Sequence, residues 1–195
     1  MFESLYDLLA QPPVAYLILF AIAAGDAIIP ALPSESAAIV AGVLAAVEPE
    51  IALPAVLAAA ALGAFVGDSG SYALGRYGGR PAQRRFFDGP HSQRAVSWAC
   101  GQLRVRGGLI LVVARFIPGG RTGATFTSGL TGFRYVVFAF FTAIAAIIWA
   151  TYAVLLGYFG GKVFEERPLL ALLVAFGLAF GLAVAVELTR RARRR

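Results

Sequence analysis

The chain has 195 residues, of which 59% are apolar and only 14% are charged. Soluble domains are about 25% charged, so the composition excludes an ordinary soluble domain, and it is too apolar for a disordered chain. A single Cys and a single His exclude an internal disulfide and make a His- or Cys-based metal centre implausible. The composition therefore predicts a small helical membrane protein with one domain, 1–195, and no metal or other cofactor.

Charge is divided unevenly along the chain. Residues 1–75 contain seven acids and no Lys or Arg, whereas residues 76–195 contain all 17 basic residues and four acids. The two parts therefore carry net charges of −7 and +13. In a membrane protein this asymmetry indicates orientation, because basic segments stay in the cytoplasm. It is a weak indication of nucleic-acid binding, and we expect no nucleic-acid partner.

The first hydrophobic region, 14–47, is interrupted by Gly25-Asp26 and by Pro30 and Pro33. Because Pro and Gly break helices, the pattern predicts a re-entrant hairpin of two short helices, with two kinked spans as the alternative. The next region, 51–75, is apolar and long enough to cross a bilayer as one transmembrane helix.

The stretch 76–106 alternates arginines with apolar residues, which is typical of an amphipathic helix lying on an anionic cytoplasmic leaflet. A solvated loop is the alternative. The region 107–132 is interrupted by Pro118-Gly119-Gly120 and is predicted to form a second re-entrant hairpin. Transmembrane helices are predicted at 135–161 and 168–188, before a basic tail at 189–195.

Together these segments predict an all-α membrane fold with about three to five transmembrane helices and two opposed re-entrant hairpins. The five-Arg tail is expected in the cytoplasm, on the same side as 76–106. Glycine pairs four residues apart, which let helices approach closely, occur at Gly63/Gly67, Gly157/Gly161 and Gly177/Gly181.

Charged residues accompany both predicted helix breaks. Asp26 and Glu35 bracket the prolines of the first break, and Arg115 and Arg121 bracket the second. A charge at membrane depth usually faces a partner or a cavity. If the two hairpins enter from opposite faces, an acidic tip and a basic tip meet near the midplane, as broken helices do in secondary transporters.

This pattern of charges suggests binding of an anion. Two arginines six residues apart can hold a phosphate in bidentate fashion, and Gly119 and Gly120 let backbone N–H groups approach the same anion. Asp26 and Glu35 can exchange protons, because burial disfavours the charged form of a carboxyl. A purely structural pairing of the acids with the arginines is the alternative.

A separate set of polar residues lies at the end of the 51–75 segment. Tyr72 and Arg76 follow Asp68 by four and eight residues, on one face of a helix. We interpret this set as an ion pair or helix anchor near the cytoplasmic interface, and we favour a structural role for it over a role in transport.

Three motifs in this order resemble those of the DedA family of membrane proteins, which is related to the VTT (SNARE-associated) domain. The resemblance runs from about residue 20 to residue 161. The motifs are Asp26-x-x-x-Pro30-x-x-Pro33-Ser34-Glu35, Gly67-Asp68-x-x-x-Tyr72-x-x-Gly75-Arg76-x-x-Gly79 and Arg115-Phe116-x-Pro118-x-x-Arg121, followed by Gly129 and Gly132.

The resemblance implies a lipid transporter. It implies that the protein moves a lipid phosphate, such as a polyprenyl (undecaprenyl or decaprenyl) phosphate, across a bacterial plasma membrane with proton or ion coupling. It assigns the family's acidic pair to Asp26 and Glu35 and its arginine pair to Arg115 and Arg121. Asp26 departs from the Glu expected at this position, and its shorter side chain changes its reach.

Other functions remain open from the sequence. A phospholipid scramblase and a proton or cation antiporter that supports membrane potential and pH homeostasis both fit the same residues. An enzyme is not expected, because the chain has no recognisable nucleophile motif or metal-ligand set. A structural or assembly protein is the remaining class. Membrane lipids are the expected partners, and a homo-oligomer is compatible with the sequence.

Overall fold

The structure is a computed structural model that describes residues 11–29, 32–79, 81, 89–117 and 120–163. Within these ranges all regular secondary structure is helical and there is no strand, which confirms the predicted helical class. Several predicted features lie outside the described residues: the span 168–188, the tail 189–195, Pro30, Pro118, Gly119, Gly177 and Gly181.

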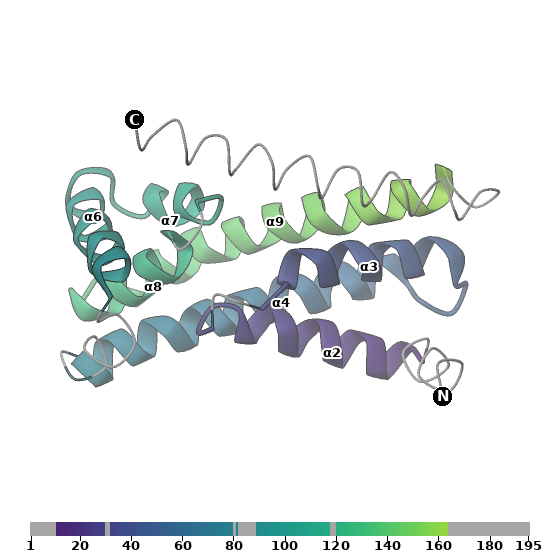
Figure 1. Cartoon of the computed structure of the whole chain (residues 1–195), viewed down its shortest axis with the longest axis horizontal. Helices are drawn as coiled ribbons and strands as arrows, with labels where there is room; N and C mark the ends of the chain where they lie inside the picture. The colour runs from purple at the N-terminus through teal and green to yellow at the C-terminus, as the bar shows by residue number, and fades with distance from the viewer. Residues whose placement is uncertain (1–10, 30–31, 80, 82–88, 118–119, 164–195) are drawn as a thin grey trace.

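Two long helices run along the molecule (Figure 1). Helix α4, Leu53–Ala73, starts with a Pro in its first turn and continues through a π-helical turn, η1, Leu74–Gly78; helix α9 is Tyr135–Val163. The apolar stretches Leu53–Gly79 and Tyr135–Lys162 have 27 and 28 residues. At 1.5 Å per residue each is about 40 Å long, enough to cross a hydrocarbon core of about 30 Å.

The region 14–47 folds as two shorter helices, α2 (Pro12–Gly25) and α3 (Ser34–Val47). Helix α2 starts at the Pro12-Pro13 pair and ends at Gly25, and Pro33 precedes the first turn of α3. Each helix has 14 residues, or about 21 Å, which is too short to cross the hydrocarbon core. The connection between them lies near the middle of the molecule (Figure 1).

The other end of the molecule holds three helices: α6 (Pro90–Arg106), α7 (Leu109–Ala114) and α8 (Gly120–Leu130). Helices α7 and α8 form the second helix–turn–helix, and α6 packs against α8 (Figure 1). Helix α6 is amphipathic, since it buries Val96, Ala99 and Leu103 and leaves Arg94 and Arg106 exposed. It covers the C-terminal part of the stretch predicted as an amphipathic helix.

Glycine contacts join the α4–η1 helix to both helix–turn–helix units and α9 to the unit of α2 and α3. Built Cβ atoms on the glycines concerned would lie 1.9–2.5 Å from a backbone oxygen of the partner helix. On α4 and α8 the contacts are Gly63 with Phe20, Gly67 with Ala24, Gly75 with Phe126 and Gly129 with Tyr72; between α3 and α9 they are Gly42 with Val154 and Gly157 with Ile39. These contacts leave no room for a side chain and set the spacing of the helices.

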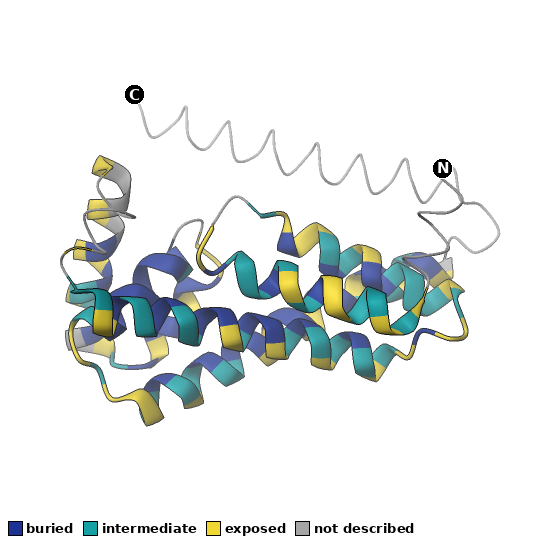
Figure 2. Cartoon of the chain, turned by 90° about the horizontal axis from the view of Figure 1, so that it is seen from below, coloured by how far each residue is buried: buried dark blue, intermediate teal, exposed yellow. Residues whose placement is uncertain are grey.

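Exposed positions run along the outer faces of the helices (Figure 2), and many of them carry large apolar side chains. Leu17 on α2, Val136 and Phe140 on α9 and Leu62 on α4 are between 57% and 75% exposed. Apolar side chains exposed in this number fit a surface that faces lipid. The interior is built from small residues, including Ala23, Ala60, Ala64 and Ala153, so the helices pack closely.

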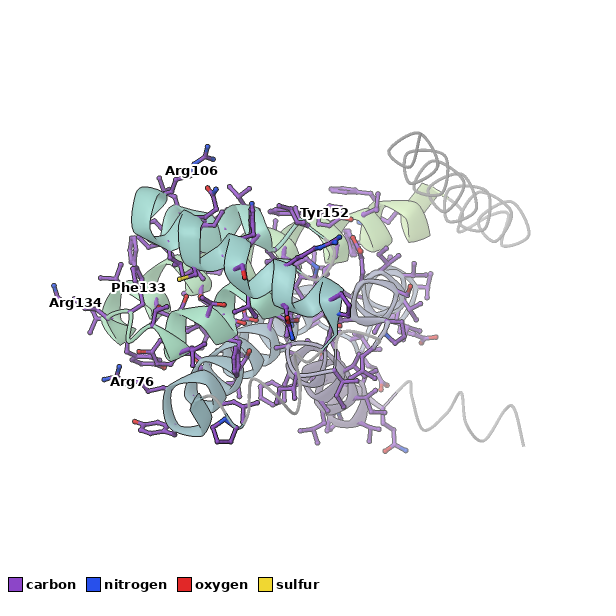
Figure 3. The ribbon with its side chains drawn as sticks, turned by 60° about the vertical axis from the view of Figure 1, so that its left-hand side comes forward. Arg76, Arg106, Phe133, Arg134 and Tyr152 are labelled. Carbon is purple, nitrogen blue, oxygen red and sulfur yellow. The ribbon has the colours of Figure 1, made fainter. Side chains whose placement is uncertain are left out.

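The two ends of the molecule differ in charge. Arg76, Arg106 and Arg134 are exposed and point outward at the end that carries α6 (Figure 3). The opposite end carries Glu48 and Glu50 between α3 and α4. The charge asymmetry of the sequence is therefore a separation between two ends of the folded chain.

Candidate functional site

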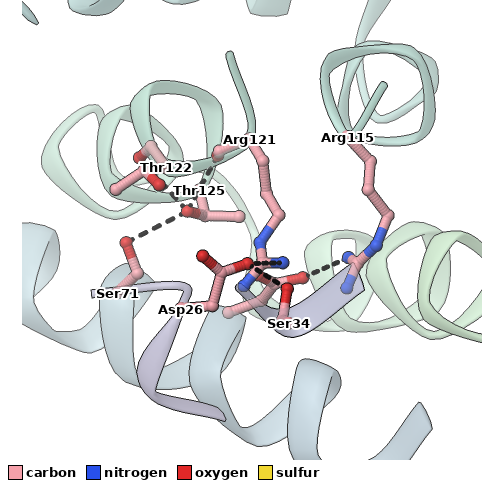
Figure 4. A network of polar contacts seen from close by, with 8 residues as sticks. Asp26, Ser34, Ser71, Arg115, Arg121, Thr122 and Thr125 are labelled. Atoms are coloured by element: carbon pink, nitrogen blue, oxygen red, sulfur yellow. Dashed lines mark hydrogen bonds and ion pairs between the residues drawn. The ribbon is translucent and has the colours of Figure 1, made fainter. Parts of the chain in front are cut away.

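The candidate site lies where the two helix–turn–helix units meet, near the middle of both long helices. Asp26 follows α2, Asp68 belongs to α4, Arg115 follows α7 and Arg121 is in the first turn of α8. We call these four residues the charge cluster. The arginines enter from the α7–α8 unit and Asp26 approaches from the opposite side (Figure 4).

Asp68 and Arg115 form the most deeply buried pair of the cluster. Arg115 Nη1 donates a hydrogen bond to Asp68 Oδ2 at 2.6 Å, and the two side chains are only 2% and 1% exposed. The Arg115 guanidinium also lies over the Trp149 ring of α9, 5.5 Å from its centroid. The aromatic face and the carboxylate together stabilise a cation that would otherwise be costly to bury.

Arg121 connects the two acids. Its Nη1 donates a hydrogen bond to Asp26 Oδ2 at 3.1 Å, and its Nε lies 3.0 Å from Asp68 Oδ1 without the alignment of a hydrogen bond. Ser34, the first residue of α3, donates its hydroxyl to Asp26 Oδ2 at 2.6 Å. Asp68 therefore faces both arginines, whereas Asp26 pairs with Arg121.

The two guanidinium groups retain hydrogen-bonding capacity. Within the described residues, four buried guanidinium nitrogens donate no hydrogen bond: Arg115 Nε and Nη2, and Arg121 Nε and Nη2, of which Arg121 Nε lies against Asp68 Oδ1. Unsatisfied buried donors are costly in a folded protein. Their position beside two carboxylates and a helix break makes this cluster the strongest candidate for binding an anion with several acceptor oxygens.

Glu35 lies outside the charge cluster. Its carboxylate accepts a short hydrogen bond from the Tyr152 hydroxyl of α9, and both side chains are exposed. The structure thus brings Asp26, Arg115 and Arg121 together and separates Glu35 from them. The predicted acidic pair, Asp26 and Glu35, therefore occupies two different environments.

The remaining predicted residues surround the cluster or lie away from it. Gly120 is buried at the start of α8, and its N–H donates to the Ile117 carbonyl at 2.8 Å. Tyr72 donates its hydroxyl to the Phe133 carbonyl at 2.6 Å, and its ring packs against that of Phe138 in a tilted arrangement, so it joins α4 to the start of α9. Arg76 is exposed at the basic end, with its guanidinium against Gly132.

The sequence did not predict that Asp68 lies at the centre of the charge cluster. In the sequence Asp68 was expected close to the interface, but the helix continues to Gly79, which puts Asp68 near its middle. Ser34 and Trp149 were not expected at the site. Their signals are weak: Ser34 is adjacent to Pro33 in the first helix break, and Trp149 lies midway along α9.

Metal binding finds no support in the described part of the chain, where no group of three or more His, Cys, Asp or Glu side chains could hold an ion. The charge cluster combines two acids with two arginines, and the arginines disfavour a cation. The chemistry that these side chains offer is instead the binding of an anion and the exchange of protons.

Comparison with known proteins gives a consistent picture. The VTT domain model matches residues 32–159. The chain is 31% identical to Protein DedA of Escherichia coli over 166 residues, which cover 83% of this chain and 74% of the relative. An uncharacterized membrane protein of Mycobacterium tuberculosis is 29% identical over 173 residues, 85% of this chain and 74% of the relative. No solved structure matches the chain significantly.

Proposed function

Because the chain belongs to the VTT domain family, a family of membrane proteins that includes DedA, we propose that it moves a lipid phosphate across the membrane. A polyprenyl phosphate, such as undecaprenyl or decaprenyl phosphate, is the proposed substrate. Arg115 and Arg121 bind its phosphate, and the apolar tail remains in the surrounding bilayer.

The observation that carries this proposal is the buried charge cluster with unused guanidinium donors. Two arginines with four buried nitrogens that donate no hydrogen bond to described residues suit a phosphate, which offers three acceptor oxygens. A charged headgroup alone faces a large barrier in hydrocarbon. Paired charges near the middle of two membrane-length helices reduce this barrier.

The arrangement of the helices supports an opposed pair of re-entrant hairpins. Helices α2 and α3 are too short to span the hydrocarbon core, and Asp26, which follows α2, contacts Arg121 in the first turn of α8. In this proposal one hairpin enters the membrane from each face, and both tips end at the charge cluster. The phosphate is then reachable from either side as the hairpins move.

Proton coupling is assigned to the acids. Asp26 competes with the substrate phosphate for Arg121, so its protonation favours loading and its ionisation favours release. Glu35 with Tyr152 forms a second proton site, nearer the surface. Asp26 and Glu35 thus act at different places along the transport path.

The orientation follows the charge difference between the two ends. The basic end, with Arg76, Arg106 and Arg134, is proposed to face the cytoplasm of a bacterial cell, with α6 on the inner leaflet of the plasma membrane. The cytoplasmic position of the C-terminus remains a prediction from the sequence. Assembly into a homo-oligomer is compatible with the exposed apolar surface of the long helices.

Two related functions use the same residues. A phospholipid scramblase would bind a phosphodiester in place of a monoester, and an antiporter would use the acids without any lipid. We favour the lipid phosphate because two arginines suit an anion more than a cation. An enzymatic function is not proposed.

The test is reconstitution of the purified chain in liposomes with fluorescent lipids on one leaflet. We expect faster transbilayer movement of the polyprenyl phosphate than of the parent alcohol or of phosphatidylcholine, and a rate that depends on the pH gradient. Equal acceleration of all lipids would indicate a scramblase. Movement of protons or cations without lipid would indicate an antiporter, and release of inorganic phosphate would indicate an enzyme.

A further inference from the structure

We propose that Asp68 is an internal anion that occupies the phosphate site of the unloaded protein, and that loading requires proton uptake by Asp68 and Asp26. This inference rests on the proposed function and specifies how the same site is regulated. It gives Asp68 a role in transport as a positioning residue. The sequence analysis assigned Asp68 only to an ion pair or helix anchor and assigned proton exchange to Asp26 and Glu35.

Asp68 makes the contacts that a bound phosphate would make. Its Oδ2 accepts a 2.6 Å hydrogen bond from Arg115 Nη1, and its Oδ1 lies 3.0 Å from Arg121 Nε. It faces both arginines, and its side chain is 1% exposed. Asp26 pairs with Arg121 and its side chain is 16% exposed, so it is the more peripheral acid.

A carboxylate fills this site only in part. Two carboxylate oxygens leave Arg115 Nε, Arg115 Nη2 and Arg121 Nη2 without an acceptor among the described residues, and Asp68 Oδ1 itself receives no aligned hydrogen bond. Three phosphate oxygens would satisfy more of these donors. The mismatch in acceptor number is what allows a substrate to replace a resident carboxylate.

The backbone around Asp68 restricts how the exchange can happen. Gly67 lies so close to Ala24 that a built Cβ would be 2.2 Å from its carbonyl oxygen, so α4 is held against α2 at this point. Withdrawal of the helix is therefore disfavoured by packing. Protonation of the Asp68 carboxyl, which weakens its hold on Arg115 without moving α4, is the simpler route to release.

Charge balance then sets the number of protons. Among the described residues, the charged groups that face the site are Asp26 after α2, Asp68 from α4, Arg115 after α7 and Arg121 from α8; α3 and α9 contribute the neutral Ser34 and Trp149. Two acids and two arginines carry no net charge. A phosphate monoester brings a charge of about −1.5 to −2, which is costly to bury uncompensated.

Binding of a monoester should therefore draw between about one and two protons into the site, and a phosphodiester, with about one charge, should draw about one. By linkage, affinity for the monoester weakens as the pH rises. The site would thus couple substrate loading to protons in proportion to the charge of the headgroup, and a monoester substrate would be moved with more protons than a phospholipid.

The experiment measures protons taken up per ligand bound. The full chain in detergent is titrated with farnesyl phosphate, a short polyprenyl monophosphate, by calorimetry at pH 8 in phosphate-free buffers of different ionisation enthalpy. We expect net uptake of about one to two protons in the wild type. In Asp68→Asn we expect about one proton fewer and binding about tenfold tighter, because a competing ion pair no longer has to break.

Controls separate the outcomes. Glu50→Gln removes an exposed carboxylate outside the cluster and should leave affinity and proton uptake unchanged. If Asp68→Asn folds poorly, farnesyl phosphate should raise its melting temperature more than that of the wild type, and the charge-balanced double variant Asp68→Asn with Arg115→Gln should fold.

The results that overturn the inference are distinct from those that overturn the proposed function. Binding by the wild type without proton uptake, or unchanged affinity and uptake in Asp68→Asn, would show that Asp68 is only a structural partner of Arg115. Such a result leaves phosphate binding by the arginines intact. Absence of any binding by the folded wild type would overturn the proposed function and this inference together.

Discussion

For the charged residues at the centre of the molecule, burial is unfavourable and ion pairing is favourable. Burial of Arg115 and Asp68 removes both charges from water, and their attraction offsets this penalty only with good geometry. The 2.6 Å hydrogen bond and the Trp149 ring supply that geometry for one nitrogen of Arg115, while two other nitrogens remain without an acceptor among the described residues. The ion pair is therefore held in place, while Arg115 keeps two donors that a bound anion can use.

Truncation of Arg115 should therefore destabilise the fold. We expect Arg115→Ala to cost about 3 kcal/mol, because Asp68 loses its closest partner while Arg121 remains nearby. Arg134→Ala, at an exposed arginine of the basic end, should change stability by less than about 0.5 kcal/mol. Thermal unfolding in one detergent compares the two variants, and equal stabilities would contradict the buried pairing of Arg115.

The Tyr152 hydroxyl gives a second test at this scale. We expect Tyr152→Phe to keep the fold but to slow transport about tenfold, the equivalent of about 1.4 kcal/mol, because Glu35 loses its hydrogen-bond donor. Tyr158→Phe removes a hydroxyl from the same helix away from Glu35 and serves as the matched control. Transport rates in liposomes decide the matter, and an unchanged rate in Tyr152→Phe would remove Glu35 and Tyr152 from the mechanism.

The sequence pointed to most of the charged residues of the site, but it did not show which of them pair. Asp26, Arg115 and Arg121 stand out because they flank helix breaks in apolar regions, and the fold brings them together. The separation of Glu35 from Asp26 could not be predicted, because it depends on the direction in which the first turn of α3 faces α9. Only the folded chain shows that Tyr152, 117 residues away in sequence, is the partner.

At the scale of helices, glycines determine how closely the elements approach. A Cβ on Gly129 would lie 1.9 Å from the Tyr72 carbonyl oxygen, and one on Gly75 would lie 2.1 Å from that of Phe126. Both positions join the C-terminal part of α4 and η1 to α8, the helix that carries Arg121. The spacing of these helices therefore positions one of the two arginines.

Filling this contact should separate α8 from α4. We expect Gly129→Ala to cost about 1–3 kcal/mol, since the new methyl group meets backbone atoms that cannot turn away. Gly160→Ala on α9 is the matched control, because no atom lies within 4 Å of its added Cβ and Ala favours a helix more than Gly. Unfolding curves that place both variants at the same stability would contradict the close packing at Gly129.

Helix breaks were predictable, whereas helix ends were less so. Gly25 and Pro33 mark the inner ends of α2 and α3 because they oppose helix continuation. The continuation of α4 through η1 to Gly79 is less evident from the sequence. A segment with Gly75, Arg76 and two more glycines is typical of a helix end at the membrane–water interface. Packing of Gly75 against α8 explains the continuation, and this contact over 50 residues of sequence has no local signal.

At the scale of the whole molecule, the described residues that join these helices lie at three levels. The loop 48–52 lies at one end of the long helices, residues 107–108 before α7 and 131–134 after α8 lie at the other, and Asp26 meets Arg121 between them (Figure 1). One end carries Arg76, Arg106 and Arg134 (Figure 3), and the opposite end carries Glu48 and Glu50. This three-level arrangement predicts which residues lie on the same side of the membrane.

Cysteine labelling tests the arrangement. In a Cys100→Ser background, which lacks the native thiol, Gln11→Cys and Glu50→Cys should react with an impermeant thiol reagent from one side of the membrane. Arg106→Cys and Arg134→Cys should react from the other side. Reaction of positions 11 and 50 from opposite sides would contradict the hairpin and would indicate an odd number of membrane crossings within 14–47.

The overall division into two broken regions and long apolar helices was predictable from composition and from Pro and Gly positions. The meeting of the two hairpin turns was suggested only by their opposite charges. What no local pattern could supply is that Asp68 lies between the two arginines, because its depth depends on where α4 ends and on how α4 packs against both hairpins.

The most direct test of the account is transport of polyprenyl phosphate by arginine variants that keep their fold. Wild type, Arg115→Gln, Arg121→Gln and the control Arg134→Gln are reconstituted in liposomes at equal density, and movement of a fluorescent polyprenyl phosphate between leaflets is followed. We predict at least a tenfold loss of rate in both cluster variants, about 1.4 kcal/mol in barrier height, and an unchanged rate in Arg134→Gln. Equal rates in all four folded proteins would contradict a phosphate site at Arg115 and Arg121.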